Sequence, residues 1–385
     1  MTVDGPQSTV HGQQERQRPE GTEKADGGNG GGRRHRRESE AMAVLKAALD
    51  RIIAHEHLTS DEAYEALSVV MRGEATGAQI GALLVALRMK GETAEEIGGF
   101  ARAMRESAVR IPTRHENVVD TCGTGGDRVE TFNISTAAAF VAAGAGVPIA
   151  KHGNRAVSSQ CGSADVLRAL GVNIEAPPEV VSRCRDEVGI GFLFAPALHP
   201  AMKHAIGPRR ELALRTVFNI LGPLTNPAGA KRQLIGVFAP EYTELLAGAL
   251  RSLGSEHALV VHGMIGLDEI STVGETQVTE LRGGEITTAM WTPEQFGLPP
   301  ARLEDLAGGD PGTCAATLTA ILEGEPGPRR DIVVLNAAAA IYVGGKAGSV
   351  GEGITLAQES IDEGRARGKM EGLREMSVGS PFRGE

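Results

Sequence analysis

The chain has 385 residues, with 39 Lys and Arg against 49 Asp and Glu, a formal net charge of −10 at pH 7, 41% hydrophobic and 23% charged residues. This composition is typical of a folded chain with two domains, or with one large α/β unit and an appendage, and it excludes disorder throughout. No stretch approaches the roughly 18 apolar residues of a membrane span, and the N-terminus lacks the apolar core of a secretory signal. The acidic balance offers no basic face for nucleic acid. We therefore expect a cytoplasmic protein with neither a membrane nor a nucleic acid as partner.

Residues 1–41 are predicted to form a disordered tail. They contain eight glycines and few large apolar side chains, so burial cannot offset the entropy lost on ordering. Seven basic residues balance seven acidic ones there, and the rest of the chain carries the whole net charge. The basic run 33–37 suits a nucleic-acid contact or a solvated cluster in a floppy extension, and the second interpretation is favoured.

Residues 42–113 are predicted to form a small helical domain. Apolar residues recur there at helical spacing, and three candidate capping boxes mark helix starts, so we expect four short helices. The three pairs are Thr59 with Glu62, Thr76 with Gln79, and Thr93 with Glu96. The segment contains no catalytic pattern, and its expected role is packing or dimerisation.

The pattern changes after Val118 to short apolar strands, glycine-rich turns and helices. This alternation predicts an α/β domain with a mostly parallel central sheet covered on both faces. Strands are expected at 118–120, 147–151, 234–238, 258–262 and 332–335, and helices at 136–143 and 242–253. Ligands of such sheets bind beyond the carboxyl ends of the strands, so the loops that leave those ends are the expected location of the chemistry.

The four cysteines are expected to be reduced thiols. They lie far apart in the sequence without CxxC spacing, which argues against a disulfide framework and against a zinc site. Their positions are Cys122, Cys161, Cys184 and Cys314.

The first expected strand leads into a glycine-rich loop at 120–127, followed by Asn-Ile-Ser-Thr at 133–136, where an Ala-rich helix begins. Glycines in the loop let backbone N–H groups approach an anion and adopt positive φ, and the helix N-terminus adds partial positive charge. The loop fits neither the GxGxxG nor the GxxxxGK[ST] pattern. A plain tight turn before a capped helix is the alternative, but the adjoining polar residues and Asp127 favour a phosphate-binding loop.

A second polar loop, 151–159, follows the next expected strand, and Ser163 opens another helix. Lys151 and Arg155 supply cationic donors near several hydroxyls, so two neighbouring anion sites suggest a ligand with two phosphorylated ends. Taken singly, these residues also suit surface cations, turn formers and helix caps. His152 stays open between a structural and a catalytic role.

Two further groups are candidates. Adjacent carboxylates at Asp268 and Glu269 follow a strand and suit Mg²⁺, which binds a few carboxylates together with substrate phosphates, although adjacent acids are also common on surfaces. Arg209, Arg210 and Arg215 can reach a carboxylate with a planar fork, and two of the three are expected to be ordinary ion pairs or solvated charges.

With these motifs in order along the chain, the sequence resembles the anthranilate phosphoribosyltransferase family. The matching segments are 123–127, 133–136, 151–159, 215–227 and 266–271, and the resemblance extends from about residue 42 to 375. It implies a helical N-terminal domain plus a larger α/β domain, a homodimer formed through the helical part, and transfer of the phosphoribosyl group of phosphoribosyl pyrophosphate (PRPP) to anthranilate. By the same resemblance, about 198–228 return to the small domain, which leaves 114–197 and 229–385 to the catalytic domain.

The resemblance also implies roles for single residues. The PRPP contacts are Gly123, Gly126, Asp127, Thr131, Asn133, Ile134, Ser135, Thr136, Lys151, His152, Gly153, Asn154, Arg155, Ala156, Val157, Ser158, Ser159 and Ser163. The Mg²⁺ ligands are Ser135, Asp268 and Glu269, and the anthranilate contacts are Gly123, Asn154, His199 and Arg209. The candidate catalytic residues are Asp127, Lys151 and His152. Two departures are Ala213, where the family often has glycine, and the N-terminal tail, which has no counterpart.

The chemistry explains these residue types. Displacement of pyrophosphate from C1 of the ribose passes through a cation-like state while charge builds on the leaving group, so Mg²⁺ and fixed N–H donors should supply most of the rate. An aromatic amine held in line needs little activation, so no indispensable general base is expected, and His152 is the less favoured candidate for one.

Two alternatives remain. A pyrimidine nucleoside phosphorylase shares the implied architecture but needs no acidic Mg²⁺ loop. A non-catalytic nucleic-acid-binding member of the same fold needs a basic groove. The acidic pair and the segment 215–227 favour the transferase over the phosphorylase. The net charge of −10 and the retained motif positions argue against the nucleic-acid binder.

Overall fold

The computed structural model describes residues 30–126, 129–156 and 160–379. Within the chain, Met1–Glu40 and Ala41–Glu385 separate into two compact units. Apart from the first residues of the first helix, the elements described below belong to the second unit. The predicted disorder of residues 1–29 lies outside the described residues. None of the helices described is long and apolar enough to cross a membrane.

Four helices open the fold, as the periodicity predicted. They are α1 (Gly30–Ile53), α2 (Ser60–Met71), α3 (Gly77–Lys90) and α4 (Ala94–Glu106). The three predicted capping boxes are confirmed: Thr59, Thr76 and Thr93 each accept the backbone N–H of the residue three positions on, which reaches back to the cap. These caps define the starts of α2, α3 and α4.

The predicted disorder is wrong for residues 30–41, because α1 begins at Gly30 and these residues are helical. From Arg33 onward the segment consists largely of Arg, Glu and Ala, which have high helix propensity. Extending an existing helix costs much less than nucleating one. The apolar turns after Ala41 therefore extend towards the N-terminus through residues whose low hydrophobicity suggested disorder.

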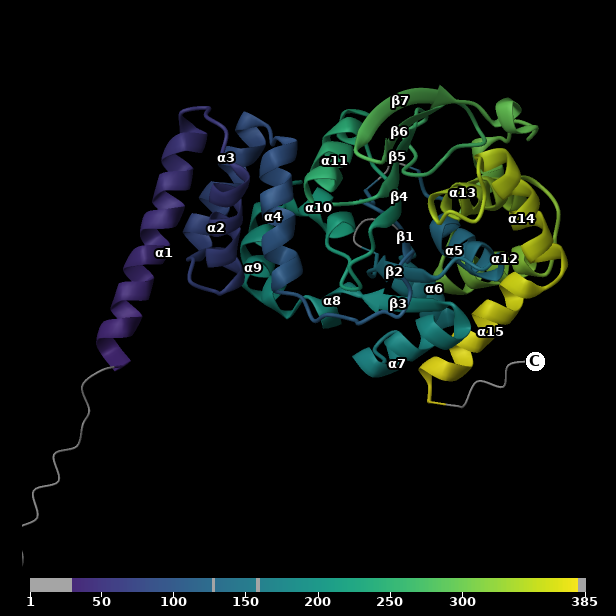
Figure 1. Ribbon diagram of the computed structural model, residues 1–385, viewed down its shortest axis with the longest axis horizontal. Coiled ribbons are helices and arrows are strands. Elements are labelled where there is room, and N and C mark those ends of the chain that lie inside the picture. The colour runs from purple at the N-terminus through teal and green to yellow at the C-terminus, as the bar shows by residue number, and fades with distance from the viewer. Residues whose placement is uncertain (1–29, 127–128, 157–159, 380–385) are drawn as a thin grey trace, which may run out of the picture. The chain divides into compact units, whose positions relative to one another are not determined.

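A seven-stranded sheet forms the centre of the larger domain, in the order β3-β2-β1-β4-β5-β6-β7 (Figure 1). The five strands from β3 to β5 are parallel, and β6 and β7 are antiparallel. The strands are β1 (Val119–Gly123), β2 (Ile149–Gly153), β3 (Ile190–Phe194), β4 (Arg232–Gly236), β5 (His257–Gly263), β6 (Thr276–Arg282) and β7 (Glu285–Trp291). The mostly parallel α/β sheet after a helical domain is confirmed.

One predicted strand is wrong. Residues 332–335 lie inside α13 (Pro328–Val343), which begins with a proline at its first turn and continues into four alanines at 337–340. A short, fully buried apolar run has the same composition in a strand and in a buried helix. The proline and the alanines after the run favour the helix.

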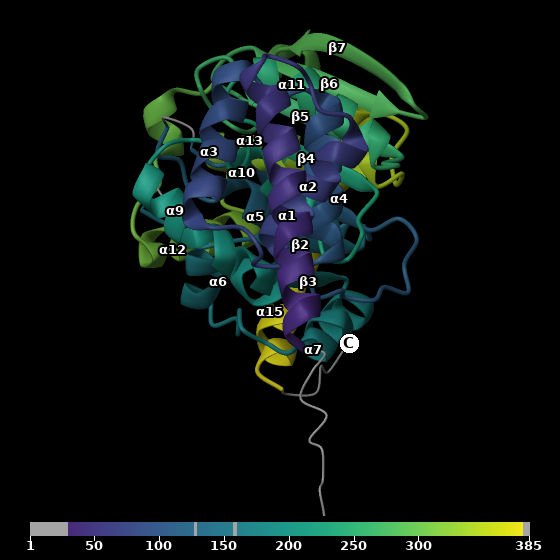
Figure 2. The ribbon, with the colours of Figure 1, turned by 90° about the vertical axis from the view of Figure 1, so that its left-hand side faces the viewer.

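The remaining helices lie on both sides of the sheet (Figures 1 and 2). They are α5 (Ile134–Gly144), α6 (Ser163–Ala169), α7 (Pro178–Arg183), α8 (Ala195–Leu198), α9 (Lys203–Leu212), α10 (Phe218–Leu221), α11 (Glu241–Ser252), α12 (Pro311–Leu322), α14 (Val350–Asp362) and α15 (Arg365–Ser377). A π-helical turn, Cys184–Val188, follows α7.

Alternate strand residues face two different cores. On β5, Leu259 and Val261 pack with α5, α12 and α13, whereas Ala258 and Val260 pack with α11 and the helical bundle. The second core also contains residues of α9 and α10, and Arg105 of α4 donates to the Leu224 carbonyl at 2.6 Å. The segment after β3 therefore packs against the N-terminal helices.

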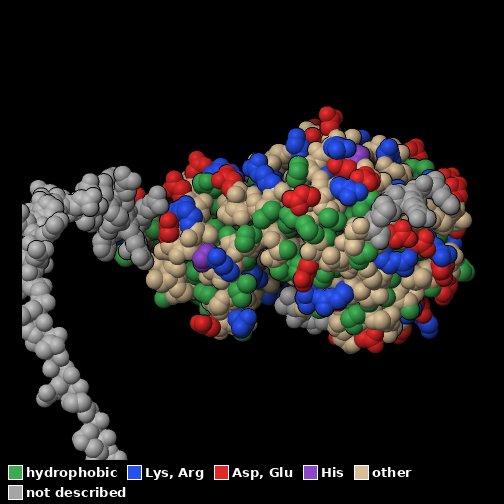
Figure 3. Space-filling view, turned by 90° about the horizontal axis from the view of Figure 1, so that it is seen from below, with side chains coloured by type: hydrophobic (Ala, Val, Ile, Leu, Met, Phe, Trp, Pro, Cys, Tyr) green, Lys and Arg blue, Asp and Glu red, His purple; other side chains and the backbone are tan. Residues whose placement is uncertain are grey.

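The cysteines of the described chain are all buried and free of disulfides. Acidic and basic side chains are interspersed over the described part of the face shown in Figure 3.

Ala213 ends α9 in the left-handed region, at φ 50°. A Cβ is unfavourable in this conformation, whereas glycine adopts it without steric cost. We expect Ala213→Gly to raise the free energy of unfolding by about 0.5–1 kcal/mol. Urea denaturation checks this, with Ala82→Gly on the exposed side of α3 as a control that should lose about 1 kcal/mol. A loss in both variants would contradict the prediction.

Candidate functional site

The candidate site lies where the parallel strands β1, β2, β4 and β5 end. Gly123 at the end of β1 is level with Gly236 at the end of β4, and β2 and β5 end at Gly153 and Gly263. The loops that leave these strand ends carry the glycine-rich, polar and acidic motifs of the sequence. Their convergence follows from the parallel topology.

The glycine loop is held by backbone contacts to β4 and to the acidic loop after β5. Thr124 donates its N–H to the Gly236 carbonyl at 2.9 Å, and Gly125 donates to Asp268 Oδ2 at 3.0 Å. Gly125 and Gly126 have φ of 61° and 76°, and a Cβ on Gly123 would lie 2.6 Å from Asp268 Oδ2. Glycine is therefore required by both conformation and space. Asp127 lies outside the described residues.

The N-terminus of α5 faces the same acidic loop. Ser135 donates its N–H to Glu269 Oε1 at 3.0 Å. The Thr136 hydroxyl is buried and has no hydrogen-bond partner in the described chain. The Asn133 side chain donates to the backbone carbonyl of Cys161 at 3.0 Å and does not cap α5. Ile134 is buried in the core, and Thr131 pairs with Ala307 in an isolated bridge.

Lys151 is only 2% exposed and directs its ammonium towards α5. Its Nζ donates to the Thr121 carbonyl and, at 3.3 Å, to the Ser135 hydroxyl. Burial lowers the pKa of this ammonium, while the carboxylates around it act in the opposite direction. The sequence-predicted Lys151 and Ser135 are thus brought together, next to Glu269.

His152 and His199 form a buried pair, with their Nε2 atoms 3.2 Å apart. Burial lowers the pKa of His152 to about 3 and that of His199 to about 4. Both rings are neutral near pH 7, so one donates and the other accepts a hydrogen bond. Neither ring can serve as a standing positive charge at the site.

This pair predicts a pH dependence of stability. Because both folded pKa values lie below the ordinary value of 6.5, the unfolded chain binds protons first as pH falls, and stability decreases from about pH 6.5 downwards. One histidine contributes a slope of up to about 1.4 kcal/mol per pH unit. We expect His199→Asn to flatten the slope by about that amount between pH 4.5 and 6, as measured by urea denaturation. An unchanged slope, or the same change in the exposed control His55→Asn, would contradict the prediction.

The second loop is closed by reciprocal contacts between Asn154 and Ser163. Asn154 donates its N–H to Ser163 Oγ at 3.3 Å, and that hydroxyl donates back to the Asn154 carbonyl at 3.2 Å. A Cβ on Gly153 would overlap the Ser163 hydroxyl. Arg155 forms an exposed ion pair with Glu175 at 3.1 Å. Val157, Ser158 and Ser159 lie outside the described residues.

No role was predicted for Asp165, although it belongs to the predicted helix start; its Oδ2 accepts the N–H groups of Ala156 at 2.9 Å and Gly162 at 3.0 Å. Its position three residues after Gly162 is a capping signal that could have revealed it. The need for glycine at position 236 was also missed. A Cβ there would overlap the Asp268 carbonyl. No local signal marks that contact, because the two residues belong to different strand-end loops.

The acidic loop offers hard oxygen donors. Burial raises the pKa of Asp268, whereas the Gly125 N–H favours its ionised form. Asn336 of α13 fixes the backbone of Ile270, the residue after Glu269. It accepts the Ile270 N–H at 3.0 Å and donates to the Ile270 carbonyl at 2.9 Å. In the described chain no three His, Cys, Asp or Glu side chains gather as a preformed metal cage. Two carboxylates and the Ser135 hydroxyl nevertheless suit Mg²⁺, which completes its shell with substrate phosphates and water.

The three candidate arginines differ in their surroundings. Arg209 stacks over Phe218, with its guanidinium carbon 5.0 Å from the ring centre, and burial lowers its pKa. It forms no ion pair within the described residues. Arg210 is exposed, and Arg215 donates to the Gly126 carbonyl and stacks over Phe238. Arg209 is thus the partly buried arginine of the three whose guanidinium is held by stacking and pairs with no carboxylate of the described chain.

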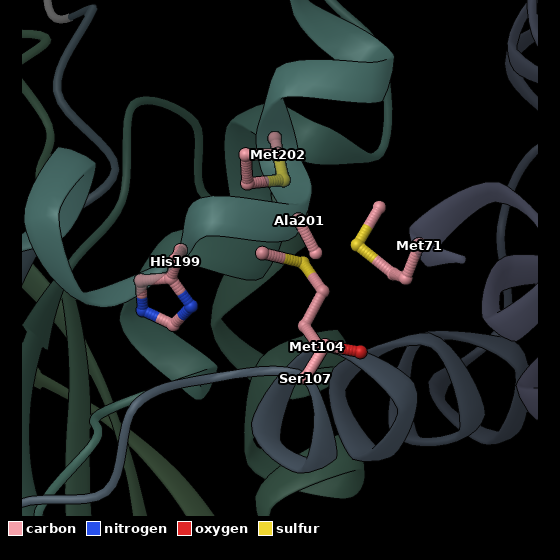
Figure 4. A pocket seen from close by; sticks show the side chains of 6 residues that line it. All are labelled: Met71, Met104, Ser107, His199, Ala201 and Met202. Carbon is pink, nitrogen blue, oxygen red and sulfur yellow. The ribbon is translucent and has the colours of Figure 1, made fainter. Parts of the chain in front are cut away.

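A small hollow lies beside His199, between the N-terminal helices and the segment after β3 (Figure 4). The thioether side chains of Met71, Met104 and Met202 lie around it, together with Ser107 and Ala201. Sequence reasoning did not select these methionines, because at helical spacing they are indistinguishable from core residues.

The chain matches two family models: "Glycosyl transferase family, helical bundle domain" over residues 46–108, and "Glycosyl transferase family, a/b domain" over residues 115–367. The order of the two matches agrees with the fold, in which helices α1 to α4 precede the sheet. The fold and the strand-end loops are therefore those of a two-domain glycosyl transferase.

Comparison with individual relatives identifies the family within this class of glycosyl transferases. The anthranilate phosphoribosyltransferase of Moorella thermoacetica is 55% identical over 86% of this chain and 97% of its own length. The crystal structure of the Thermus thermophilus enzyme of that name has a TM-score of 0.82 at 47% identity, covering 86% of this chain and 99% of that one. The Saccharomyces cerevisiae enzyme in complex with PRPP and Mg has a TM-score of 0.79 at 29% identity, covering 87% and 98%. The chain belongs to the anthranilate phosphoribosyltransferase family.

Proposed function

We propose that this chain transfers the phosphoribosyl group of PRPP to the amino group of anthranilate, releasing pyrophosphate, as a step of tryptophan biosynthesis. The observation that carries the proposal is the convergence of the glycine loop, the α5 N-terminus, Lys151 and the acidic loop at the ends of β1, β2, β4 and β5. The names of the relatives support the choice of acceptor.

The proposed PRPP site uses the backbone of the glycine loop and of the α5 N-terminus. Two N–H groups of these segments, those of Gly125 and Ser135, donate to carboxylate oxygens, which supports a backbone oriented towards negatively charged groups. Lys151 adds a buried ammonium whose Nζ lies 3.3 Å from the Ser135 hydroxyl, and the buried hydroxyl of Thr136, the next residue of α5, has no partner in the described chain. The other proposed contacts are Gly123, Gly126, Asp127, Thr131, Asn133, Ile134 and 152–159 with Ser163.

Asp268, Glu269 and the Ser135 hydroxyl would hold Mg²⁺, whose charge, when the ion is bound, stabilises the negative charge that develops on the departing pyrophosphate. This assignment is supported by the donor set and by the metal in the structure of the Saccharomyces cerevisiae relative. The chain's own contribution is to place two carboxylates against the loop that cradles the phosphates.

Arg209 is proposed to pair with the carboxylate of anthranilate, and Asn154, Gly123 and His199 to line its position. The stacking on Phe218 holds the guanidinium in place, and its surroundings in the described residues leave its fork available. A relative from Saccharomyces cerevisiae has been solved in complex with 4-fluoroanthranilate, which supports a ring site of this kind.

The residues then act by position and charge. Backbone N–H groups and Lys151 stabilise the leaving pyrophosphate, while Arg209 and Asn154 keep the amine in line with C1. The neutral pair His152 and His199 adds no positive charge beside the cation-like ribose.

The homodimer is also a proposal. Met42 and Ile53 on α1 and Met89 on α3 are the three most exposed large apolar side chains of the helical domain, at 61%, 68% and 77%, which supports an interface there.

The direct test is the decay of anthranilate fluorescence when the purified chain meets PRPP and Mg²⁺, with EDTA and PRPP-free controls. A decay that requires both PRPP and metal supports the transferase. No decay, with phosphorolysis of uridine or thymidine by the same preparation, would replace it by a pyrimidine nucleoside phosphorylase.

A further inference from the structure

A buried carboxylate next to the site is not among the proposed substrate contacts. Asp120 on β1 is fully buried, and its two oxygens bind two different segments. Oδ1 accepts the His152 N–H at 2.9 Å, and Oδ2 accepts from Asn226 Nδ2 at 2.8 Å. The carboxylate therefore links β1, β2 and the segment that returns from the helical bundle.

Asn226 completes this link. Its Nδ2 also donates to the Ala150 carbonyl at 2.8 Å, and its Oδ1 accepts the Ala228 N–H at 2.8 Å. The side chain is 3% exposed, so each of these groups would be costly to leave unpaired. Together, Asp120 and Asn226 bind the backbone on both sides of Lys151, at Ala150 and at His152.

The arrangement bears on Lys151 in two ways. Since side chains alternate along a strand, clamping the backbone at residues 150 and 152 fixes the direction in which Lys151 projects, which is towards Ser135. The carboxylate also opposes the charge of the ammonium within the same buried region. A buried ionised carboxylate is expensive compared with an apolar side chain of similar size, so its presence calls for a reason other than stability.

We propose that Asp120, acting through Asn226 and the backbone of His152, is a positioning residue for Lys151 and His152 in the phosphoribosyl transfer. The inference rests on the proposed function. It assigns to the pair Asp120 and Asn226 the task of coupling the returning segment to the strand end that binds PRPP.

The test compares Asp120→Asn, Asn226→Asp and the exchange of the two residues in one chain. Each single variant leaves two donors, or two acceptors, facing each other. The exchange keeps one carboxylate and one amide, and it restores the bonds to His152 and Ala228 while losing that to Ala150. We expect kcat/KM for PRPP to fall at least tenfold in each single variant, mainly through KM, and to return to within about threefold of wild type in the exchange.

A matched control separates positioning from general loss of packing. Gln233 on β4 is level with Asp120, is equally buried, and donates to the Pro223 carbonyl of the same returning segment at 2.7 Å. Gln233→Met removes that bond without touching β2. We expect it to lower the melting temperature and to leave the KM for PRPP unchanged.

Single variants with a wild-type KM for PRPP, or an exchange no better than the single variants, would overturn the inference. If the exchange variant does not fold, Asn226→Ser decides, because it weakens the same link and keeps Asp120: a raised KM supports the proposal and an unchanged KM rejects it. Failure of the proposed function itself is recognised separately, by a wild-type chain that does not consume anthranilate. PRPP binding measured by calorimetry then takes the place of KM in the same comparison.

Discussion

Replacing both acidic-loop carboxylates, by Asp268→Asn with Glu269→Gln, is expected to lower turnover at millimolar Mg²⁺ roughly a hundredfold and to raise the Mg²⁺ concentration needed for half-maximal rate. Asp268 accepts the Gly125 N–H of the glycine loop, and Glu269 accepts the Ser135 N–H at the α5 N-terminus. Amides of the same shape can still accept those N–H groups, so the fold should persist while the charge for the metal is lost.

The measurement is a Mg²⁺ titration of the fluorescence assay, together with direct metal binding by calorimetry, which needs no turnover. Glu285→Gln with Glu294→Gln changes the net charge equally at two exposed positions and serves as control. Wild-type rates for the Asp268 and Glu269 variant at every Mg²⁺ concentration would dismiss the metal assignment.

Arg209→Ala is expected to raise the KM for anthranilate by about ten- to a hundredfold and to leave the KM for PRPP nearly unchanged. A guanidinium fork paired with a carboxylate makes two charge-assisted hydrogen bonds, and losing them at a partly buried site costs about 1.5–3 kcal/mol. Arg209→Lys should give an intermediate value, because an ammonium keeps the charge but not the bidentate geometry.

Arg210→Ala is the matched control, since Arg210 is the exposed neighbour on the same helix. Steady-state kinetics with each substrate varied in turn measure the KM for anthranilate and the KM for PRPP in each variant. An equal effect of Arg209→Ala on both substrates would reject its role as the carboxylate contact and indicate a general disturbance of α9.

Much of the fold and part of the site could be predicted because the signals are local. The capping boxes at Thr59, Thr76 and Thr93 lie within four residues, so the sequence alone determines where α2, α3 and α4 begin. The glycines at 125 and 126 adopt positive φ, as their residue type suggested. The strand before each polar loop was likewise recognised from its apolar run.

Other features were not predicted. The helical state of 332–335 is indicated by the proline and the alanines of the same helix, but the apolar run alone has the same composition in a strand. Among the missed strands, β3 has only five residues, whereas β7 is largely exposed and has no continuous apolar run. The left-handed Ala213 offers no residue-type signal either, since alanine is normally a helix former.

The sequence by itself determined the class of chemistry, since a glycine loop, a lysine and an acidic pair at strand ends suit a phosphorylated ligand with Mg²⁺. Tertiary structure alone decided which of these groups meet. Asp268 reaches Gly125 across 143 positions, Glu269 reaches Ser135 across 134, and His199 meets His152 across 47. The physical reason is that parallel pairing brings the ends of distant strands to one edge of the sheet, whereas local periodicity carries no information about the order in which strands pair.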